Sequence, residues 1–224
     1  MQNDTVQICN ILCTKFLEYR NLKFTAINGE LKMISNNTLI ELINHQGFVI
    51  IQAERNIPRG KRKNVYIVLI NTEKANLKKD GILKIYSIID KQEGGNMELD
   101  EVILIAEPEL FKKKHINDVI LNKTSENKSG ADEKGTKPYY SVYPYTKFRC
   151  VVPEHILVPK HEICPPEVLW AFNNILRISN NQFPLIRSYD SMVAWTGAHI
   201  GELLKITRND PHAPQSIEYR LVVK

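Results

Sequence analysis

The sequence has few cysteines, and their spacing excludes a disulfide framework. Cysteine occurs four times in 224 residues, at Cys9, Cys13, Cys150 and Cys164. Cys9 and Cys13 stand four residues apart on one face of an expected helix, which is typical of small core residues and not of a redox pair. We therefore expect four free thiols, as is usual in a reducing compartment.

The chain also lacks long hydrophobic runs. No stretch approaches the ~20 apolar residues that a membrane span requires, and the first four residues, Met-Gln-Asn-Asp, begin no basic patch followed by an apolar run. We therefore expect neither a membrane partner nor a secretory signal. Hydrophobic residues make up 43% and charged residues 25% of the sequence, which is typical of a soluble globular protein. An intracellular protein is expected.

Neither sign of charge dominates. The 30 basic residues exceed the 25 acidic ones by five, and the sequence pI is about 8.9. This mild excess permits a nucleic-acid partner without requiring one.

Helical and extended patterns alternate through the first two thirds of the chain. Helices are predicted from capping residues and apolar periodicity at 4–20, 36–46 and 109–121, the last opened by Pro108. Strands are predicted at 48–51, 65–70, 102–106 and 139–143. Residues 82–90 fit either a helix or a strand. Such alternation predicts an α/β layer structure.

A polar segment and a proline-bracketed interval separate this part from the rest. Residues 123–137 contain no large apolar side chain before the tyrosines at 139–140, so we predict a flexible loop. We place the domain boundary between 148 and 149. Beyond it we predict helices at 165–176 and 191–195, the second capped by Asp190, an extended segment at 185–186, and paired strands at 202–207 and 217–223.

The last third carries an ordered set of motifs. They are His155-Ile156-Leu157-Val158-Pro159-Lys160-His161-Glu162-Ile163, Phe183-Pro184-Leu185-Ile186, Asp190, Gly197, Gly201-Glu202-Leu203-Leu204-Lys205-Ile206-Thr207-Arg208 and Tyr219-Arg220-Leu221-Val222. From about residue 150 onward this order resembles the fifth-subunit family of eukaryotic-type RNA polymerases, which includes the equivalent archaeal subunits.

The N-terminal part resembles that family in outline only. The shared features are Phe16-Leu17-Glu18-Tyr19-Arg20, a strand-rich middle and Tyr143-Pro144-Tyr145, in a style closest to versions carried by large cytoplasmic DNA viruses of the asfarvirus type. The chain departs from the family at Ser191, at Trp195-Thr196, at His199-Ile200 and in the proline-rich turn 209–216. These departures affect the details of the docking surface.

The resemblance implies a two-domain α/β (α+β) protein without catalytic residues, metal or cofactor. Residues 1–148 would form a three-layer α/β jaw domain beside downstream duplex DNA. Residues 149–224 would form a small α+β assembly domain with a mixed sheet, which docks on the largest polymerase subunit and adjoins other core subunits. Location would be the host cytoplasm (the virus factory) and the virion for a viral source, or the nucleus for a cellular one.

The same resemblance implies a set of docking residues. They are Leu157, Val158, Pro159, Lys160, His161, Pro184, Ile186, Gly197, Gly201, Lys205, Arg208, Tyr219 and Arg220. Pro159 holds the backbone extended, so apolar and cationic groups would share a rigid edge that suits a permanent protein partner. The two glycines would allow the turn before the final strands. Without the family resemblance, these residues could serve only to build the local fold.

Two basic clusters are candidates for contact with DNA. The first, Arg59, Lys61, Arg62 and Lys63, could bind phosphates by charge alone, or could be the solvated tip of a hairpin. The second, Lys112, Lys113 and Lys114, follows Pro108 near the start of the helix predicted at 109–121, where a helix N-terminus would attract phosphate.

Three further functions compete with this interpretation. Cys150, His155, His161 and Cys164 could ligate zinc, but their spacing fits no standard zinc module. Because the family's jaw fold resembles restriction endonucleases, a nuclease is conceivable, but Asp90, Glu107 and Asp118 form no Glu-x-Lys pair beside a strand. Phosphate-binding loops and nucleophile elbows are absent from the sequence. The main alternative is a free-standing nucleic-acid-binding transcription regulator that uses the docking domain for recruitment.

Overall fold

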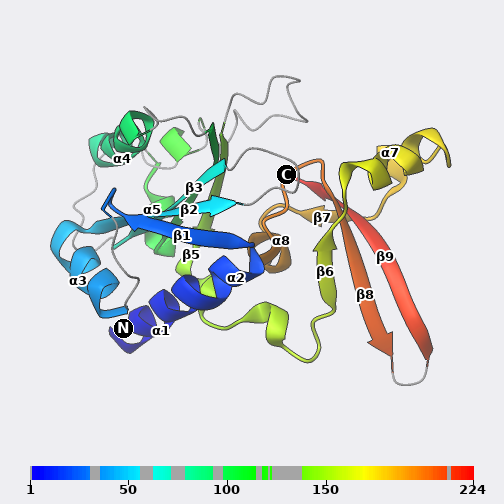
Figure 1. Cartoon of the computed structure of the whole chain (residues 1–224), viewed down its shortest axis with the longest axis horizontal. Helices are drawn as coiled ribbons and strands as arrows, with labels where there is room; N and C mark the ends of the chain where they lie inside the picture. Colours follow the sequence, from blue (N-terminus) through cyan, green and yellow to red (C-terminus); the bar gives the residue numbers. More distant parts are fainter. Residues whose placement is uncertain are drawn as a thin grey trace. The chain divides into compact units, whose positions relative to one another are not determined.

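A five-stranded mixed sheet forms the centre of the N-terminal part of the chain (Figure 1). The computed structural model describes residues 2–30, 36–55, 63–71, 79–92, 98–114, 118–120, 122, 138–210 and 213–224. The chain divides into two compact units, Met1–Cys150 and Val151–Lys224. This division falls two residues beyond the expected boundary.

The strands of the N-terminal unit follow one another in sequence order across the sheet. They are β1 (Leu22–Ile27), β2 (Phe48–Arg55), β3 (Lys63–Ile70), β4 (Glu98–Ala106) and β5 (Tyr139–Pro144). β1, β2 and β3 pair antiparallel, whereas β4 joins β3 and β5 joins β4 in parallel. Parallel pairing requires crossover connections, and helix α4 (Lys79–Gln92) lies between β3 and β4 in the sequence.

Both faces of this sheet are covered. Tyr66 and Val68 of β3 pack in one cluster with Ile82 and Ile85 of α4, while the alternate residue Ile67 is also fully buried. Figure 1 shows α4 on one side of the sheet and α1 (Gln2–Ile11) and α3 (Asn36–Gln46) on the other. The expected three-layer α/β arrangement is confirmed, because a strand that is apolar on both faces needs helices on both sides.

Most of the elements predicted for the N-terminal unit are confirmed, with three differences. The opening helix runs through α1, a π-helical segment (Leu12–Phe16) and α2 (Leu17–Tyr19). Strand β1 was not predicted, although Lys23 and Thr25 alternate with Leu22, Phe24 and Ala26 as in a strand with one buried face. The helix predicted at 109–121 is wrong as one element: α5 (Pro108–Lys112) ends where Lys113 becomes extended, with ψ 108°, and residues 114, 118–120 and 122 are helical again. The segment predicted as a loop at 123–137 lies outside the described residues.

A four-stranded mixed sheet forms the C-terminal unit, as expected. Its order is β6 (Lys160–Ile163), β8 (Leu203–Asp210), β9 (Ala213–Val223) and β7 (Leu185–Arg187), with only β7 parallel to its neighbour. Helix α7 (Pro166–Asn174) packs Val168, Leu169 and Phe172 with Leu203 and Leu221 in one cluster. Helix α8 (Ser191–Thr196) contributes Val193 to a second cluster, with Ile186, Ala198, Leu204 and Val222.

Candidate docking surface

Large apolar side chains that reach solvent are concentrated in the C-terminal unit. Among the described residues, Tyr19 and Leu83 are the exposed examples in the N-terminal unit. The smaller C-terminal unit has nine: Ile156, Leu157, Ile163, Trp170, Ile175, Leu176, Leu185, Tyr189 and Ile217. Such residues are of interest where they adjoin one another, because contiguous exposed apolar surface is typical of interaction sites.

The most exposed of these side chains lie on the turn that precedes β6. Ile156 is 94% and Leu157 83% exposed. The His155 carbonyl accepts a hydrogen bond from the Val158 N–H at 2.9 Å, and the His155 Nδ1 accepts from the Leu157 N–H at 3.2 Å. Local hydrogen bonds therefore fix a turn whose two apolar side chains have almost no contact with the unit itself.

Strand β6 continues from this turn along one edge of the sheet. Its Lys160 Nζ lies 2.7 Å from the Glu162 carboxylate, and both side chains are exposed. His161 is half-buried, and its Nδ1–H donates to the Pro159 carbonyl at 2.8 Å. Burial lowers the pKa of His161, an effect that the Pro159 hydrogen bond and Asp190 oppose. At neutral pH the cation of this edge is therefore Lys160, while His161 is a neutral group with a fixed orientation.

The other expected docking residues lie on both faces of the sheet or inside it. Lys205 pairs across strands with Tyr219 and with Glu162, which places these side chains on the face that carries α7. On the opposite face, Arg208 and Arg220 bind the same carboxylate, that of Glu218, at 3.5 and 2.9 Å.

Several members of that set build the fold. Ile186 is buried in the cluster with α8. Gly197, with φ 77°, ends α8 by donating its N–H to the Val193 carbonyl, and Gly201, with φ 92°, donates to the Val222 carbonyl. Pro184 is exposed, and its carbonyl accepts from the Leu221 N–H. The expected glycine turn is present, and Asp190 caps α8 through the Met192 N–H at 2.8 Å.

The proposed zinc string does not form a metal centre in the described part of the chain. No group of three or more His, Cys, Asp or Glu side chains there could hold a metal ion. All four cysteines are free thiols, and burial raises the pKa of Cys9 to about 11.

In the described part of the chain, no helix has the length and the apolar character that a membrane span requires.

The basic clusters are described in part. Arg59, Lys61 and Arg62 lie outside the described residues, and of Lys63 only the backbone, which begins β3, is described. Lys112, Lys113 and Lys114 are exposed. Lys112 ends α5, where a cation complements the helix dipole, whereas Lys113 is extended and Lys114 is helical again. The prediction that the cluster stands near the start of one helix over 109–121 is therefore wrong for Lys112, and contact of the cluster with DNA stays a prediction.

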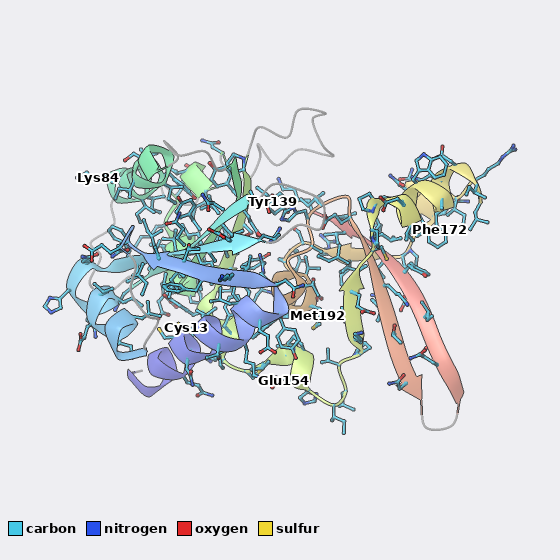
Figure 2. All side chains as sticks on the ribbon, viewed as in Figure 1. Cys13, Lys84, Tyr139, Glu154, Phe172 and Met192 are labelled. Carbon is cyan, nitrogen blue, oxygen red and sulfur yellow. The ribbon has the colours of Figure 1, made fainter. Side chains whose placement is uncertain are left out.

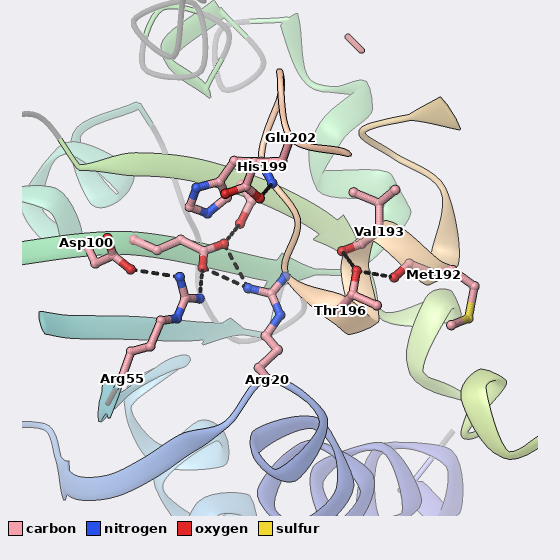
Figure 3. A network of polar contacts seen from close by, with 10 residues as sticks. Arg20, Arg55, Asp100, Met192, Val193, Thr196, His199 and Glu202 are labelled. Atoms are coloured by element: carbon pink, nitrogen blue, oxygen red, sulfur yellow. Dashed lines mark hydrogen bonds and ion pairs between the residues drawn. The ribbon is translucent and has the colours of Figure 1, made fainter. Parts of the chain in front are cut away.

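A buried charge network in the N-terminal unit was not predicted (Figure 3). Arg20 binds Glu101, and Arg55 binds both Glu101 and Asp100, at 2.8 to 2.9 Å. A bulge in β4 places Glu101 opposite Val65 and leaves Asp100 as the extra residue, so consecutive carboxylates reach one guanidinium. Ser141 also donates to Glu101 at 2.9 Å.

This network bears on the nuclease alternative. The Glu101 carboxylate is engaged by two arginines and one hydroxyl, so it is committed to structure. Of the carboxylates considered from the sequence, Glu107 precedes α5, Asp118 is exposed, and the side chain of Asp90 lies outside the described residues.

Comparisons with known proteins concern the C-terminal unit. Residues 150–222 match a family model described as RNA polymerase Rpb5, C-terminal domain. The DNA-directed RNA polymerase subunit Rpo5 of Methanocaldococcus jannaschii is 41% identical over 73 residues, which is 33% of this chain and 94% of that protein. Rpo5 of Archaeoglobus fulgidus is 41% identical over 70 residues (31% and 92%), and Rpo5 of Sulfolobus acidocaldarius is 37% identical over 78 residues (35% and 93%). These relatives therefore correspond almost entirely to the C-terminal unit.

Proposed function

This chain belongs to the family of the RNA polymerase subunits Rpb5 and Rpo5, and from that premise we propose that it is a non-catalytic subunit of a multi-subunit DNA-dependent RNA polymerase. In this proposal the C-terminal unit docks on the largest subunit and adjoins other core subunits. The N-terminal unit forms part of the lower jaw near downstream DNA. The protein acts inside the cell, in the cytoplasmic virus factory and virion if its source is viral, or in the nucleus if its source is cellular.

One observation carries the docking proposal. The unit shared with the archaeal subunits presents Ile156 and Leu157 to solvent on a turn held by backbone hydrogen bonds. Exposed apolar side chains are unfavourable in an isolated protein, at roughly 25 cal/mol per Å² of apolar surface left in water. A permanent partner that covers them explains why a rigid turn displays them.

The DNA proposal rests on charge alone. Lys112, Lys113 and Lys114 are exposed in the N-terminal unit, and contacts from lysines to phosphates need no sequence-specific hydrogen bonds. Such contacts suit a jaw domain that holds duplex DNA of any sequence while the polymerase moves.

Purification of the intact polymerase tests the proposal. We expect one copy of the chain per core enzyme, retained through gel filtration at high salt. Substituting Pro159, Lys160 and His161 together should reduce incorporation while the N-terminal unit stays folded. Association that is lost at moderate salt would favour the free-standing regulator, and a complete, active polymerase without this chain would overturn the subunit proposal.

A further inference from the structure

A groove lies between α7 and strand β9 in the C-terminal unit. Its volume is about 320 Å³, and it is lined by Glu167, Val168, Ala171, Phe172, Leu176 and Tyr219. Phe172, labelled in Figure 2, comes from the middle of α7. Its ring packs edge-on against Tyr219, with ring centroids 5.0 Å apart. The floor of the groove is therefore apolar and partly aromatic.

Helix α7 is poorly covered for a helix of this composition. None of its residues is fully buried, although it packs on the sheet through Val168, Leu169 and Phe172. On its outer side Trp170 is 60% exposed, and Ile175 and Leu176 just beyond its end are 67% and 59% exposed. A solvent-facing helix normally carries polar residues there. Of these residues, Leu176 also lines the groove.

The polar groups of the groove lie at Glu167 and Tyr219. Glu167 stands in the first turn of α7 and is exposed. Within the described part of the chain, neither the Glu167 carboxylate nor the Tyr219 hydroxyl has a hydrogen-bond or ion-pair partner. A carboxylate beside aromatic faces is complementary to a lysine or arginine, whose methylene stem packs on the rings while its charge reaches the carboxylate.

We propose that this groove binds an amphipathic helix of a partner protein. The helix inserts a large apolar side chain between Ala171 and Tyr219 and places a lysine or arginine, one turn away, against Glu167. Spacing of i to i+4 brings these two side chains onto one helix face. The groove is separate from the turn at 155–158, and the inference goes beyond the proposed function because it does not depend on a polymerase.

Tryptophan fluorescence of the full chain provides the test. The chain has two tryptophans: Trp170, which is exposed on α7 one helical turn from Glu167, and Trp195, which is fully buried in α8. The probes are two synthetic helical peptides of leucine, alanine and glutamine that differ at one position, lysine in one and glutamate in the other. We expect saturable binding with a blue shift of Trp170 emission, and about fivefold tighter binding of the lysine peptide, the effect of one exposed ion pair.

Variants decide whether the groove is responsible. Ala171→Glu should abolish binding of both peptides, and Glu167→Gln should remove the preference for lysine without preventing binding. The matched control is Leu83→Glu, which replaces an exposed apolar residue of the N-terminal unit and should bind both peptides as the unmodified chain does. Equal affinity for the two peptides, or unchanged binding by Ala171→Glu, would overturn the proposal. So would a concentration-dependent dimer that Ala171→Glu dissociates, since a second copy would then be the occupant.

Discussion

The guanidinium of Arg20 donates hydrogen bonds to both carboxylate oxygens of Glu101 at 2.9 Å, and both side chains are buried. Arg20 directly follows α2, whereas Glu101 lies in β4, so the pair fixes the end of the opening helix to the sheet. Burial alone would lower the pKa of Arg20, but Glu101 and Tyr143 together outweigh it and raise that pKa. The arginine is therefore charged at every physiological pH.

Arg20→Met should strongly destabilise the N-terminal unit. It leaves the Glu101 carboxylate buried without the arginine that binds both of its oxygens, and breaking a buried pair costs about 3 kcal/mol or more. Urea unfolding followed by far-UV circular dichroism should show the loss. Tryptophan fluorescence should be unchanged, because both tryptophans lie in the C-terminal unit.

Lys15→Gln is the matched control. The Lys15–Glu18 pair spans 4.0 Å and is largely exposed, so its loss should cost less than about 1 kcal/mol. An Arg20→Met protein as stable as this control would contradict a stabilising role for the buried network.

Local sequence signals predicted local structure well. Gly47 ends α3 with φ 77°, and Asp190 caps α8, each where the sequence places a capping residue. Residues 82–90 were ambiguous because isoleucine suits both helices and strands. The structure shows a helix, since Ile82 and Ile85 are buried while Leu83 is 42% exposed.

The buried network could not be predicted in the same way. Glu101 lies 81 residues from Arg20 and 46 from Arg55 in the chain, and the position of its side chain depends on a bulge at Asp100. No pattern of neighbouring residues in the sequence predicts partners that lie so far apart. The motif His155–Ile163 pointed to the apolar turn at 155–158. The exposure of its side chains could be seen only in the three-dimensional structure.

The stability of the C-terminal unit should fall as the pH drops from 7.5 to 5.5. Burial lowers the folded-state pKa of His161 below its unfolded value, so the fold favours the neutral imidazole. The resulting stabilisation is complete above the unfolded pKa of about 6.5 and is lost as the pH falls toward the folded pKa. Among the charged groups around this imidazole, Asp190 opposes the lowering of its pKa, and Arg208 and Arg220 add to it.

Urea unfolding followed by tryptophan fluorescence at the two pH values measures this effect. His161→Gln, which cannot be protonated, should have a smaller loss of stability between pH 7.5 and 5.5. If its loss equals that of the unmodified chain, the imidazole does not contribute.

Replacing both Ile156 and Leu157 by aspartate should prevent incorporation into the polymerase without destabilising the chain. Both side chains are more than four-fifths exposed, so they contribute little to the fold. Quantitative co-purification and urea unfolding measure the two effects separately. Leu83→Asp is the control, because it places a charge at an exposed apolar position of the N-terminal unit. Full incorporation of the double variant would show that the docking surface lies elsewhere.

Gly201→Ala should destabilise the C-terminal unit by about 1–2 kcal/mol, since a side chain at positive φ strains the backbone. Its φ is 92°, and an added Cβ meets nothing within 4 Å, so backbone strain is the only cost. Gly201→Asn should lose less stability, because asparagine tolerates positive φ better. Fluorescence-detected urea unfolding compares the two, and equal stability of Gly201→Ala and the unmodified chain would exclude strain.

The two basic clusters should differ in their effect on DNA retention if only one lies near the duplex. Each lost phosphate contact lowers the slope of log affinity against log salt by about 0.9. Replacing Lys112, Lys113 and Lys114 by glutamine should therefore reduce the slope for the assembled polymerase by up to about 3. Neutralising Arg59, Lys61, Arg62 and Lys63 together tests the other cluster, and neither set should alter assembly. The exposed Lys84 on α4 provides the control substitution to glutamine. A cluster whose removal leaves the slope equal to that of the Lys84 variant is a solvated surface, because phosphate contacts cannot be lost without changing the salt dependence.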